Sequence, residues 1–328
     1  MINMTLNCAI IIPLYNKEQH IWRALDSVLN QTIKFRQVIV VNDCSTDKSA
    51  EVVERFIAEY PQIPITFIQH LRNSGPGGAR NTGLDASSCD YVCFLDADDY
   101  LCSTAAEGIF RVLANSDPSP GLIIYRVKEQ GGGVVRPNFH RLKKLGLLKV
   151  VGVGVFKVSD WASTMIAEPL FCSGGNVVVS RGLCKSRFNP AIRNFEDWDF
   201  YFRACLMASQ LGVDILISDH IGLTYTEDDQ HSLSRSAVVS QSLRTPPPFV
   251  LDTSLPLKVR RYTTGIWLCH VTQRSNWIDG LHFIVKSLRQ VGDARPIFIH
   301  LLAAVIGLLI GRKGWAVLSQ LRKKVLYV

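Results

Sequence analysis

The segment YVCFLDADDY (residues 91–100) sets three carboxylates, those of Asp96, Asp98 and Asp99, directly after an apolar run. Carboxylates this close repel one another, so the group needs a cationic partner: a divalent metal ion, a basic side chain or a helix N-terminus. Two or three carboxylates with room for phosphate oxygens suit a hard cation such as Mg²⁺ or Mn²⁺. The structural alternative is a strand-to-helix junction at which Asp98 or Asp99 caps the next helix.

Apolar runs of strand length alternate with segments of helical period through the first third of the chain. We expect strands at residues 8–13, 37–42, 65–70 and 91–96, helices at 18–30 and 49–60, and a short helix after Gly78. Continuous apolar strands joined by helices predict an α/β fold with a parallel sheet covered on both faces. Ligands of such sheets bind at the carboxyl ends of the strands. The polar segments LYNKE, DCSTD, NSGPGGARN and DADD follow the four strands, so the sequence predicts a site at that edge.

The chain becomes less regular after this region. The glycines at 131–133 and the basic segment HRLKKLG (residues 140–146) suggest an inserted or mobile loop. Regular structure is expected again at the segment CSGGNVVVSR and in an amphipathic helix at residues 194–212. Glu196 and Asp197 fall in the first turn of that helix, where the helix dipole favours carboxylates, so a purely structural role is an alternative for both.

Composition limits the class of protein. The chain has 328 residues, of which 47% are hydrophobic and 20% charged, and this is typical of one or two globular domains. Nine cysteines lie scattered without a CxxC pair, which argues against a disulfide framework or a structural zinc site and favours a reducing, cytoplasmic setting. The apolar run at residues 8–14 has no basic region before it and ends at a polar turn. We interpret it as a strand and not as a signal peptide.

Six motifs resemble glycosyltransferase family 2, the enzymes of the GT-A fold that move a sugar from a nucleotide diphosphate donor. They are IIIPLYNKE, ALDSVLNQT, VIVVNDCSTD, NSGPGGARNTGL, FLDADDYL and FEDWDFYFR, and they cover roughly residues 7–235 in the family's order and spacing. The resemblance implies a GT-A catalytic domain at residues 1–243, with a nucleotide-binding half at 1–115 and an acceptor-binding half at 116–243. Its mostly parallel, Rossmann-like sheet would be flanked by helices.

The resemblance also implies a set of donor-binding residues at the strand ends: Pro13, Tyr15, Asn16, Asp43, Ser45, Arg80, Asn81, Asp96 and Ala97. Within this set, Asp43 would bind the base of the donor. Arg80 and Asn81 would support the nucleotide and the acidic motif. One motif departs from the family, because NDCS stands where DDGS is more common. Cys44 lacks the freedom of glycine at positive φ, so we expect the turn there to differ.

A divalent cofactor, Mn²⁺ or Mg²⁺, and a catalytic base follow from the same resemblance. Asp96 and Asp98 form the D-x-D motif, with Asp98 as the expected direct metal ligand. His231 is the candidate third ligand, in a segment that only loosely resembles the family; a surface histidine without that role is the alternative. Asp197, paired with Glu196 in the FED motif, resembles the general base that takes the proton of the acceptor hydroxyl.

We therefore expect an inverting transferase that moves a hexosyl group from a nucleotide diphosphate donor, with uridine as the expected base, to a glycan or lipid-linked hydroxyl. The family implies a setting in cell-surface polysaccharide synthesis, with no nucleic-acid partner. A sugar nucleotidyltransferase is one alternative, but it would carry a glycine-rich phosphate loop after the first strand, where LYNKEQH stands. A non-catalytic nucleotide-sugar-binding relative is another, and the intact D-x-D and Glu-Asp pairs disfavour it.

The positive charge of the chain lies in its tail. Residues 257–328 carry 12 Lys and Arg against two Asp, a net charge of +10, whereas the residues before them carry 24 basic and 26 acidic side chains. A proline-rich linker at 244–256 precedes this tail. The longest apolar stretch, 297–310, would be about 21 Å long as a helix, shorter than a hydrocarbon core of about 30 Å. We predict a helical extension that lies peripherally on the cytoplasmic face of the membrane. A helical pair packed against the catalytic domain is the alternative.

Overall fold

The computed structural model describes residues 5–131, 133, 135–192, 195–226, 252–260 and 262–263. The chain divides into two compact units, Met1–Asp229 and Gln230–Val328. His231, most of the predicted linker, the apolar stretch 297–310 and nearly all of the predicted helical extension lie outside the described residues. Within the described ranges, no helix is long and apolar enough to cross a membrane.

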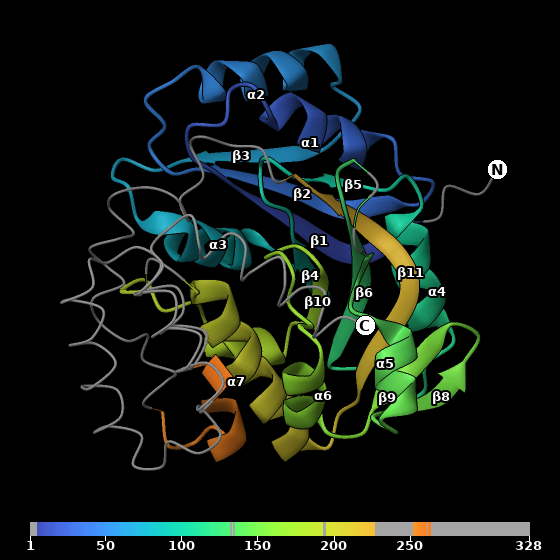
Figure 1. Cartoon of the computed structure of the whole chain (residues 1–328). Coiled ribbons are helices and arrows are strands. Elements are labelled where there is room, and N and C mark those ends of the chain that lie inside the picture. The colour runs from blue at the N-terminus through green and yellow to red at the C-terminus, as the bar shows by residue number, and fades with distance from the viewer. Residues whose placement is uncertain are drawn as a thin grey trace. The chain divides into compact units, whose positions relative to one another are not determined.

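One mixed sheet of eleven strands forms the centre of the first unit (Figure 1). In spatial order its main path consists of β3 (Ile65–Gln69), β2 (Lys34–Asn42), β1 (Thr5–Leu14), β4 (Tyr91–Phe94), β10 (Val177–Ser180), β6 (Leu122–Glu129), β11 (Ile215–Tyr225), β9 (Val155–Val158) and β8 (Leu148–Gly152). The first four strands are parallel, β10 runs antiparallel between β4 and β6, and β11 is parallel to β6. The short strands β5 (Tyr100–Leu101) and β7 (Val135–Arg136) pair with β11 and β6. The predicted mostly parallel sheet is confirmed.

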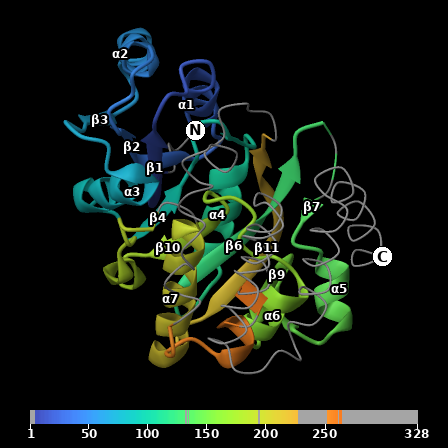
Figure 2. The ribbon, with the colours of Figure 1, turned by 60° about the vertical axis from the view of Figure 1, so that its left-hand side comes forward.

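Helices cover both faces of this sheet, with α1 and α2 on one side of β1 to β3 and α3 on the other (Figures 1 and 2). The described helices of this unit are α1 (Ile21–Leu29), α2 (Ser49–Glu59), α3 (Gly75–Ala86), α4 (Ala105–Ala114), α5 (Phe139–Lys144), α6 (Trp161–Ala167), α7 (Glu196–Leu211) and the 3₁₀ turn η1 (Leu183–Ser186). Ile10 and Ile12 of β1 share a core with α1, α2 and α4. Ile11 faces α3, where a Cβ on Gly83 would come within 2.3 Å of it, so this approach requires glycine. Because both faces of the sheet are covered, the apolar run of β1 is continuous from Cys8 to Leu14.

Two local expectations are corrected. Helix α3 begins at Gly75, three residues before Gly78, because the Asp43 carboxylate accepts hydrogen bonds from backbone N–H groups at its start. The basic segment that suggested an inserted or mobile loop contains α5, and the Asn138 side chain caps this helix by accepting an N–H of its first turn. In both places a side-chain oxygen accepts backbone N–H groups at the helix start, and the pattern of apolar residues does not reveal this contact.

Candidate active site

The loops that follow β1 and β2 are tied together at the carboxyl edge of the sheet. The Ser45 hydroxyl accepts a hydrogen bond from the Asn16 N–H (3.0 Å), and Asn16 Oδ1 accepts one from the Thr46 N–H (2.8 Å). Pro13 still belongs to β1, and the side chain of Tyr15 just after it is 38% exposed. These contacts bring the predicted donor-binding residues of the two loops together.

The turn after β2 has a conformation suited to glycine although a cysteine occupies it. Cys44 has a φ of 64°, in the left-handed region where a Cβ atom is unfavourable. Asn42, buried at the end of β2, supports the turn by accepting the Ser45 N–H at Oδ1 (3.2 Å). We expected Cys44 to change the turn; instead it adopts the positive φ, at a cost in backbone strain.

Asp43 is buried, with 3% of its side chain exposed, and its carboxylate faces the start of α3. Oδ1 accepts the Ser74 N–H (2.8 Å), Oδ2 accepts the Gly75 N–H (2.7 Å), and His70 Nδ1 lies 2.7 Å from Oδ1. These contacts give Asp43 a structural part in the connection from β2 to α3. Its contact with the base of a donor stays a prediction.

Arg80, in the second turn of α3, joins the D-x-D motif to the start of α7. Its Nη2 donates to Asp96 Oδ1 (2.8 Å) and its Nη1 to Glu196 Oε1 (2.7 Å). The guanidinium is 5% exposed and lies 5.4 Å from the centroid of the Phe188 ring. Burial alone would lower the pKa of Arg80. The charges of Asp96 and Glu196 outweigh this effect and raise the pKa above its usual value. Arg80 therefore stays charged and orients two carboxylates at once. Its support of a bound nucleotide stays a prediction.

The other two carboxylates of the acidic motif differ in burial. Asp98 pairs with Lys17 of the loop after β1, with Nζ 2.8 Å from Oδ2, and its side chain is 26% exposed. Asp99 is 1% exposed and accepts hydrogen bonds from the Ser173 hydroxyl and the Thr226 N–H, both at 3.0 Å. Burial, followed by the charges of the two neighbouring aspartates, raises the pKa of Asp99 well above its usual range. Asp99 supports the loop from within, whereas Asp98 faces the open edge.

Basic side chains offset the repulsion among these carboxylates. Lys17 faces Asp98 and Arg80 faces Asp96. The alternative in which an aspartate of the motif caps the following helix is excluded, because α4 begins only at Ala105.

Asp96 and Asp98 present oxygen ligands of the kind that a divalent ion prefers. Their side chains are 30% and 26% exposed, and Arg80 contacts only one oxygen of Asp96. Carboxylates on an open edge suit Mg²⁺ or Mn²⁺ when phosphate oxygens fill the remaining positions. Among the described residues, no three His, Cys, Asp or Glu side chains gather as a metal site, and His231 lies outside those residues. The two carboxylates fit a partial site that a bound diphosphate would complete.

Glu196 and Asp197 begin α7 but have different surroundings. Glu196 is 8% exposed and bonded to Arg80. Asp197 is half-buried, and its Oδ1 accepts the Trp198 N–H at 2.9 Å. Burial and then the charge of Glu196 raise the pKa of Asp197 to about 7, although Arg80 opposes this effect. A carboxylate with such a pKa can accept a proton near neutral pH, whereas Glu196 serves as the partner of Arg80.

Backbone strain gathers around the same edge. In the described part of the chain, the non-glycine residues with positive φ are Asn16 (50°), Cys44 (64°) and Phe195 (61°). The first two follow β1 and β2, and Phe195 directly precedes Glu196. Because such conformations are costly for residues with a Cβ atom, they concentrate at functional sites. This distribution supports the assignment of the site independently of its charges.

A glycine pair that sequence reasoning left without a role lies beneath the acidic motif. A Cβ on Gly174 would come within 2.9 Å of Arg80 Nη2 and 3.2 Å of Asp96 Oδ2, and one on Gly175 within 2.9 Å of a β4 carbonyl. The Tyr201 hydroxyl of α7 donates to the Gly174 carbonyl at 2.5 Å. Two consecutive glycines, separated from a buried apolar strand only by Asn176, were the available signal, since glycines often mark a close backbone approach.

Two predicted donor-binding residues have their side chains placed elsewhere. Asn81 exchanges a pair of hydrogen bonds with the backbone of Phe188, donating to its carbonyl (2.8 Å) and accepting from its N–H (2.9 Å). Ala97 is buried, with 4% of its surface exposed. Asn81 thus secures the segment that covers Arg80, and donor contacts by either residue stay predictions.

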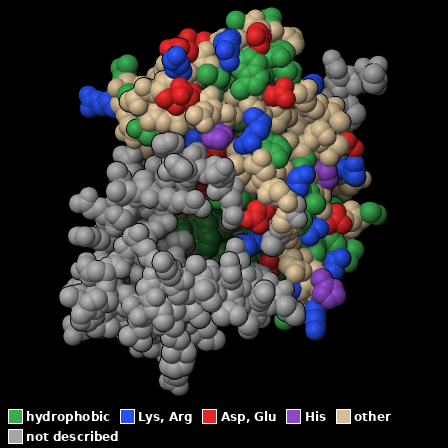
Figure 3. Space-filling view, turned by 45° about the horizontal axis from the view of Figure 1, so that its top comes forward, with side chains coloured by type: hydrophobic (Ala, Val, Ile, Leu, Met, Phe, Trp, Pro, Cys, Tyr) green, Lys and Arg blue, Asp and Glu red, His purple; other side chains and the backbone are tan. Residues whose placement is uncertain are grey.

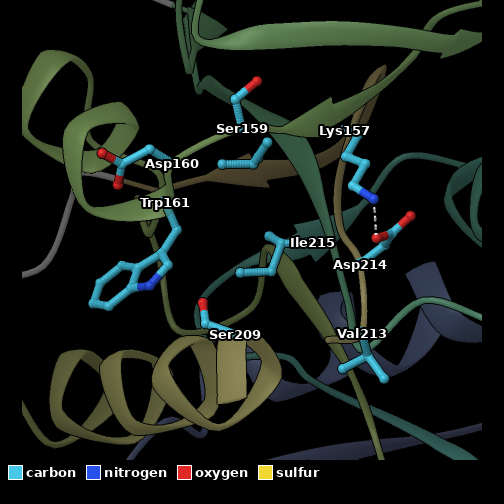
Figure 4. A pocket seen from close by; sticks show the side chains of 9 residues that line it. Lys157, Ser159, Asp160, Trp161, Ser209, Val213, Asp214 and Ile215 are labelled. Carbon is cyan, nitrogen blue, oxygen red and sulfur yellow. Dashed lines mark ion pairs between the residues drawn. The ribbon is translucent and has the colours of Figure 1, made fainter. Parts of the chain in front are cut away.

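A separate pocket of about 250 Å³ lies between β9, α6, the end of α7 and the start of β11 (Figure 4). Lys157 and Asp214 form an ion pair at its rim, and the Trp161 ring points from the start of α6 toward α7, where its centroid lies 6.2 Å from that of Phe202. None of the predicted site residues lines it. β11 starts here at Ile215 and ends beside Asp99, so the pocket lies toward the opposite end of that strand from the acidic motif.

Residues 9–146 match the family described as Glycosyl transferase family 2. An uncharacterized glycosyltransferase of Rickettsia bellii is 41% identical over 269 residues, which is 81% of this chain and 35% of that protein. The teichoic acid poly(glycerol phosphate) polymerase of Staphylococcus epidermidis is 29% identical over 247 residues, 66% of this chain and 32% of the polymerase. The chain thus spans about a third of the length of these relatives.

Solved glycosyltransferase structures share the fold. S. aureus TarS (residues 1–349, in complex with UDP-GlcNAc) has a TM-score of 0.61 at 20% identity, covering 92% of this chain and 90% of that one. The mannosyltransferase PcManGT of Pyrobaculum calidifontis, in complex with GDP-Man and Mn²⁺, has a TM-score of 0.53 at 15% identity, covering 97% and 87%. The expected GT-A fold is confirmed for the sheet and its helices.

Proposed function

We propose that this chain, a member of glycosyl transferase family 2 through its residues 9–146, transfers a sugar from a nucleotide diphosphate donor to a hydroxyl group of a glycan or lipid-linked acceptor. The observation that carries the proposal is the Arg80 bridge. Arg80 links Asp96, which belongs to the motif that would hold the leaving group, to Glu196. Glu196 is the neighbour of Asp197, whose pKa is raised to about 7. The two halves of a glycosyl transfer, leaving-group support and proton removal, are thereby coupled through one guanidinium.

A uridine diphosphate sugar is the proposed donor. TarS was solved with UDP-GlcNAc, and it has the same fold as this chain. The exposed ring of Tyr15 and the joined loops after β1 and β2 would receive the nucleotide at the carboxyl edge, where ligands of parallel sheets bind. The identity of the sugar would depend on contacts with the loops around this edge.

Asp96 and Asp98 would hold Mn²⁺ or Mg²⁺, which when bound would neutralise charge on the departing diphosphate. PcManGT, solved with Mn²⁺, supports the use of such an ion. In this chain Arg80 orients Asp96 through their ion pair, and Gly174 leaves room for that pair. Lys17 places a positive charge at Asp98, close to where the phosphates would lie.

Asp197 is the proposed general base. It would take the proton of the acceptor hydroxyl as that oxygen attacks the anomeric carbon, and a single displacement of this kind inverts the configuration. Burial and the charge of Glu196 raise the pKa of Asp197 into the range where it can accept and release a proton. Glu196 would act as a positioning residue, because its carboxylate is held by Arg80.

The proposed setting is the synthesis of a cell-surface glycopolymer. The relative from Staphylococcus epidermidis is a teichoic acid polymerase, and it matches two thirds of this chain. A reducing, cytoplasmic location fits the free cysteines of the described residues, since none of these forms a disulfide. The domain limits at 243 and 256, and a peripheral membrane contact through 257–328, remain part of the same proposal.

The test is hydrolysis and transfer with a panel of nucleotide sugars, in Mn²⁺ or Mg²⁺ and again in a chelator. We expect turnover of a UDP-sugar that the chelator abolishes, and its loss in Asp98→Ala. Glu59→Ala, which removes an exposed acid from α2, is the matched control and should behave as the wild type. Release of pyrophosphate from a nucleoside triphosphate and a sugar phosphate would instead identify a nucleotidyltransferase, and binding without turnover of any donor would indicate a non-catalytic relative.

A further inference from the structure

One edge of the sheet has an unusual charge composition. Acidic and basic side chains intermix over the upper part of the described surface in Figure 3. Residues 130–159 depart from this mixture, because they contain no Asp or Glu and six basic residues: Arg136, Arg141, Lys143, Lys144, Lys149 and Lys157. This stretch contains α5 and the hairpin of β8 and β9, and β8 is the last strand of the sheet. We call residues 139–158 the α5–β8 edge.

The α5–β8 edge also exposes aliphatic side chains. Leu145 is 54% exposed, Val150 68%, Val151 50% and Val153 fully exposed. Val153 lies in the turn of the hairpin, next to Gly154, whose φ of +69° suits a tight turn. Single exposed aliphatic residues are ordinary, but four within nine positions make this segment unusually apolar for a protein surface.

Basic and aliphatic side chains of this edge lie side by side. Lys143 Nζ is 4.3 Å from the centroid of the Phe156 ring, and Phe156 pairs with Val150 across the hairpin. Figures 1 and 2 both place α5 beside β9. Lys149 pairs with Lys157 on the opposite face of the hairpin. Alternation along the strands therefore puts Val150 and Phe156 on one face of the hairpin, and Lys149 and Lys157 on the other.

The acids nearest to this edge leave two of its lysines without a described partner. Asp214 pairs with Lys157, and Glu168 is buried. Asp219 lies at the base of the hairpin turn, against Gly154. In the part of the chain that the structure describes, Lys144 and Lys149 take part in no ion pair. Their charge is available to an anionic partner.

The residue types at this edge discriminate among partners. A second copy of the chain would pair strand to strand with β8, and Lys149 would then face a like charge, which disfavours that pairing. A soluble polyanion would use the lysines, but the exposed valines would contribute nothing to its binding. An anionic membrane uses both, since lysines pair with lipid phosphates while aliphatic side chains enter the headgroup region.

We propose that the α5–β8 edge docks on an anionic membrane surface, with Val151 and Val153 entering the headgroup region and Lys144 and Lys149 contacting lipid phosphates. This contact is separate from any made by residues 257–328. It is independent of the sugar-transfer reaction, because none of its residues belongs to the candidate active site.

Flotation of the full chain with phosphatidylcholine vesicles, with and without phosphatidylglycerol, tests the proposal. We expect binding only to the anionic vesicles. The double variant Lys144→Gln, Lys149→Gln should bind the anionic vesicles about 25-fold more weakly, because each lysine contributes about fivefold. Val151→Ser with Val153→Ser should weaken it about tenfold. Lys185→Gln and Leu71→Ser, which change exposed residues of the same types elsewhere, are the controls and should bind as the wild type.

A local probe separates this edge from other membrane contacts of the chain. An environment-sensitive fluorescent amino acid at position 153 should shift to the blue with anionic vesicles and not with soluble poly(glycerol phosphate). If only the lysine variants weaken binding and the probe does not shift, the edge binds phosphate chains and the proposal is wrong. If all variants bind vesicles as the wild type does and the probe is silent, another part of the chain makes the contact, which also overturns it.

Discussion

The carboxyl group of Asp43 faces the start of α3 and Asp197 lies in the first turn of α7, yet their surroundings are opposite. Asp43 faces two backbone N–H groups and a histidine, which satisfy both of its oxygens. Asp197 accepts one described N–H and lies beside the charge of Glu196, and its pKa rises to about 7. The first arrangement satisfies the oxygens of its carboxyl group with described contacts. The second raises the pKa of Asp197, so this residue can accept a proton near neutral pH.

This difference shows that motif position does not determine the surroundings of an acidic residue. Both residues belong to motifs that predict a role at the site, and both are close to a helix N-terminus, which favours negative charge. What separates them is the ratio of hydrogen-bond donors to neighbouring acids. Arg80 donates hydrogen bonds to Asp96 and Glu196 and so raises that ratio for both. The described donor to Asp197 is the Trp198 N–H. The following predictions test this contrast.

The largest effect is expected from Asp197→Asn. The amide cannot take the proton of the acceptor, so turnover should fall by about 10²–10⁴-fold, while the affinity for UDP measured by calorimetry stays unchanged. Asp85→Asn, at a carboxylate of α3 that is 71% exposed, is the matched control and should retain full turnover. Near-normal transfer by Asp197→Asn would show that the base lies elsewhere.

Arg80→Met should have the next largest effect, on stability. It leaves Asp96 and Glu196 without their shared counter-charge, and breaking a buried pair of this kind lowers the free energy of unfolding by about 3–5 kcal/mol. Urea denaturation monitored by circular dichroism measures the loss. Arg80→Lys can keep one of the two contacts and should fall between the wild type and Arg80→Met. Equal stability of all three proteins would mean that the bridge does not hold the site together.

Asp43→Asn should destabilise the fold without altering the chemistry of the base. The amide has the shape of the carboxylate but carries no negative charge to face the N–H groups at the start of α3. A hydrogen bond to a charged group contributes about 2 kcal/mol to the free energy of unfolding. Thermal unfolding should show this loss, and the pH midpoint of transfer should stay where it is in the wild type. Ser74→Ala is the control, because Ser74 contacts Asp43 through its backbone N–H. A shift of the pH midpoint in Asp43→Asn would break the contrast between the two acids.

The pH dependence of turnover should report the raised pKa of Asp197. Since the base acts only when ionised, the rate should rise about tenfold for each pH unit below about 7 and level off above it. Glu196 is one of the charges that raise this pKa, so Glu196→Gln should lower the pKa and move the midpoint to lower pH. A profile measured with a saturating donor and acceptor decides this. A midpoint that does not move, or moves upward, would contradict the assignment.

Much of the fold could be predicted because its signals are local. The apolar runs that became β1, β2, β3 and β4, and the helical periods between them, were visible in single segments of the chain. Their order predicted a parallel sheet, and the parallel sheet predicted that Asn16, Asp43 and Asp96 would meet at one edge. The helix start at Gly75 and the existence of α5 were missed. The N–H groups at these helix starts donate to Asp43, which is distant in sequence, and to Asn138, and neither residue belongs to an apolar pattern.

By itself, then, the sequence determined which acids gather at the carboxyl edge, because strand direction alone carries them there. Only the tertiary structure decided which groups surround each of them. Arg80, Asp96 and Glu196 come from three separate elements, and their mutual distances depend on how α3 and α7 pack against the sheet. The pKa of Asp197 depends in turn on burial and on those neighbours. Charge interactions act through space and not along the chain, so no local pattern could assign them.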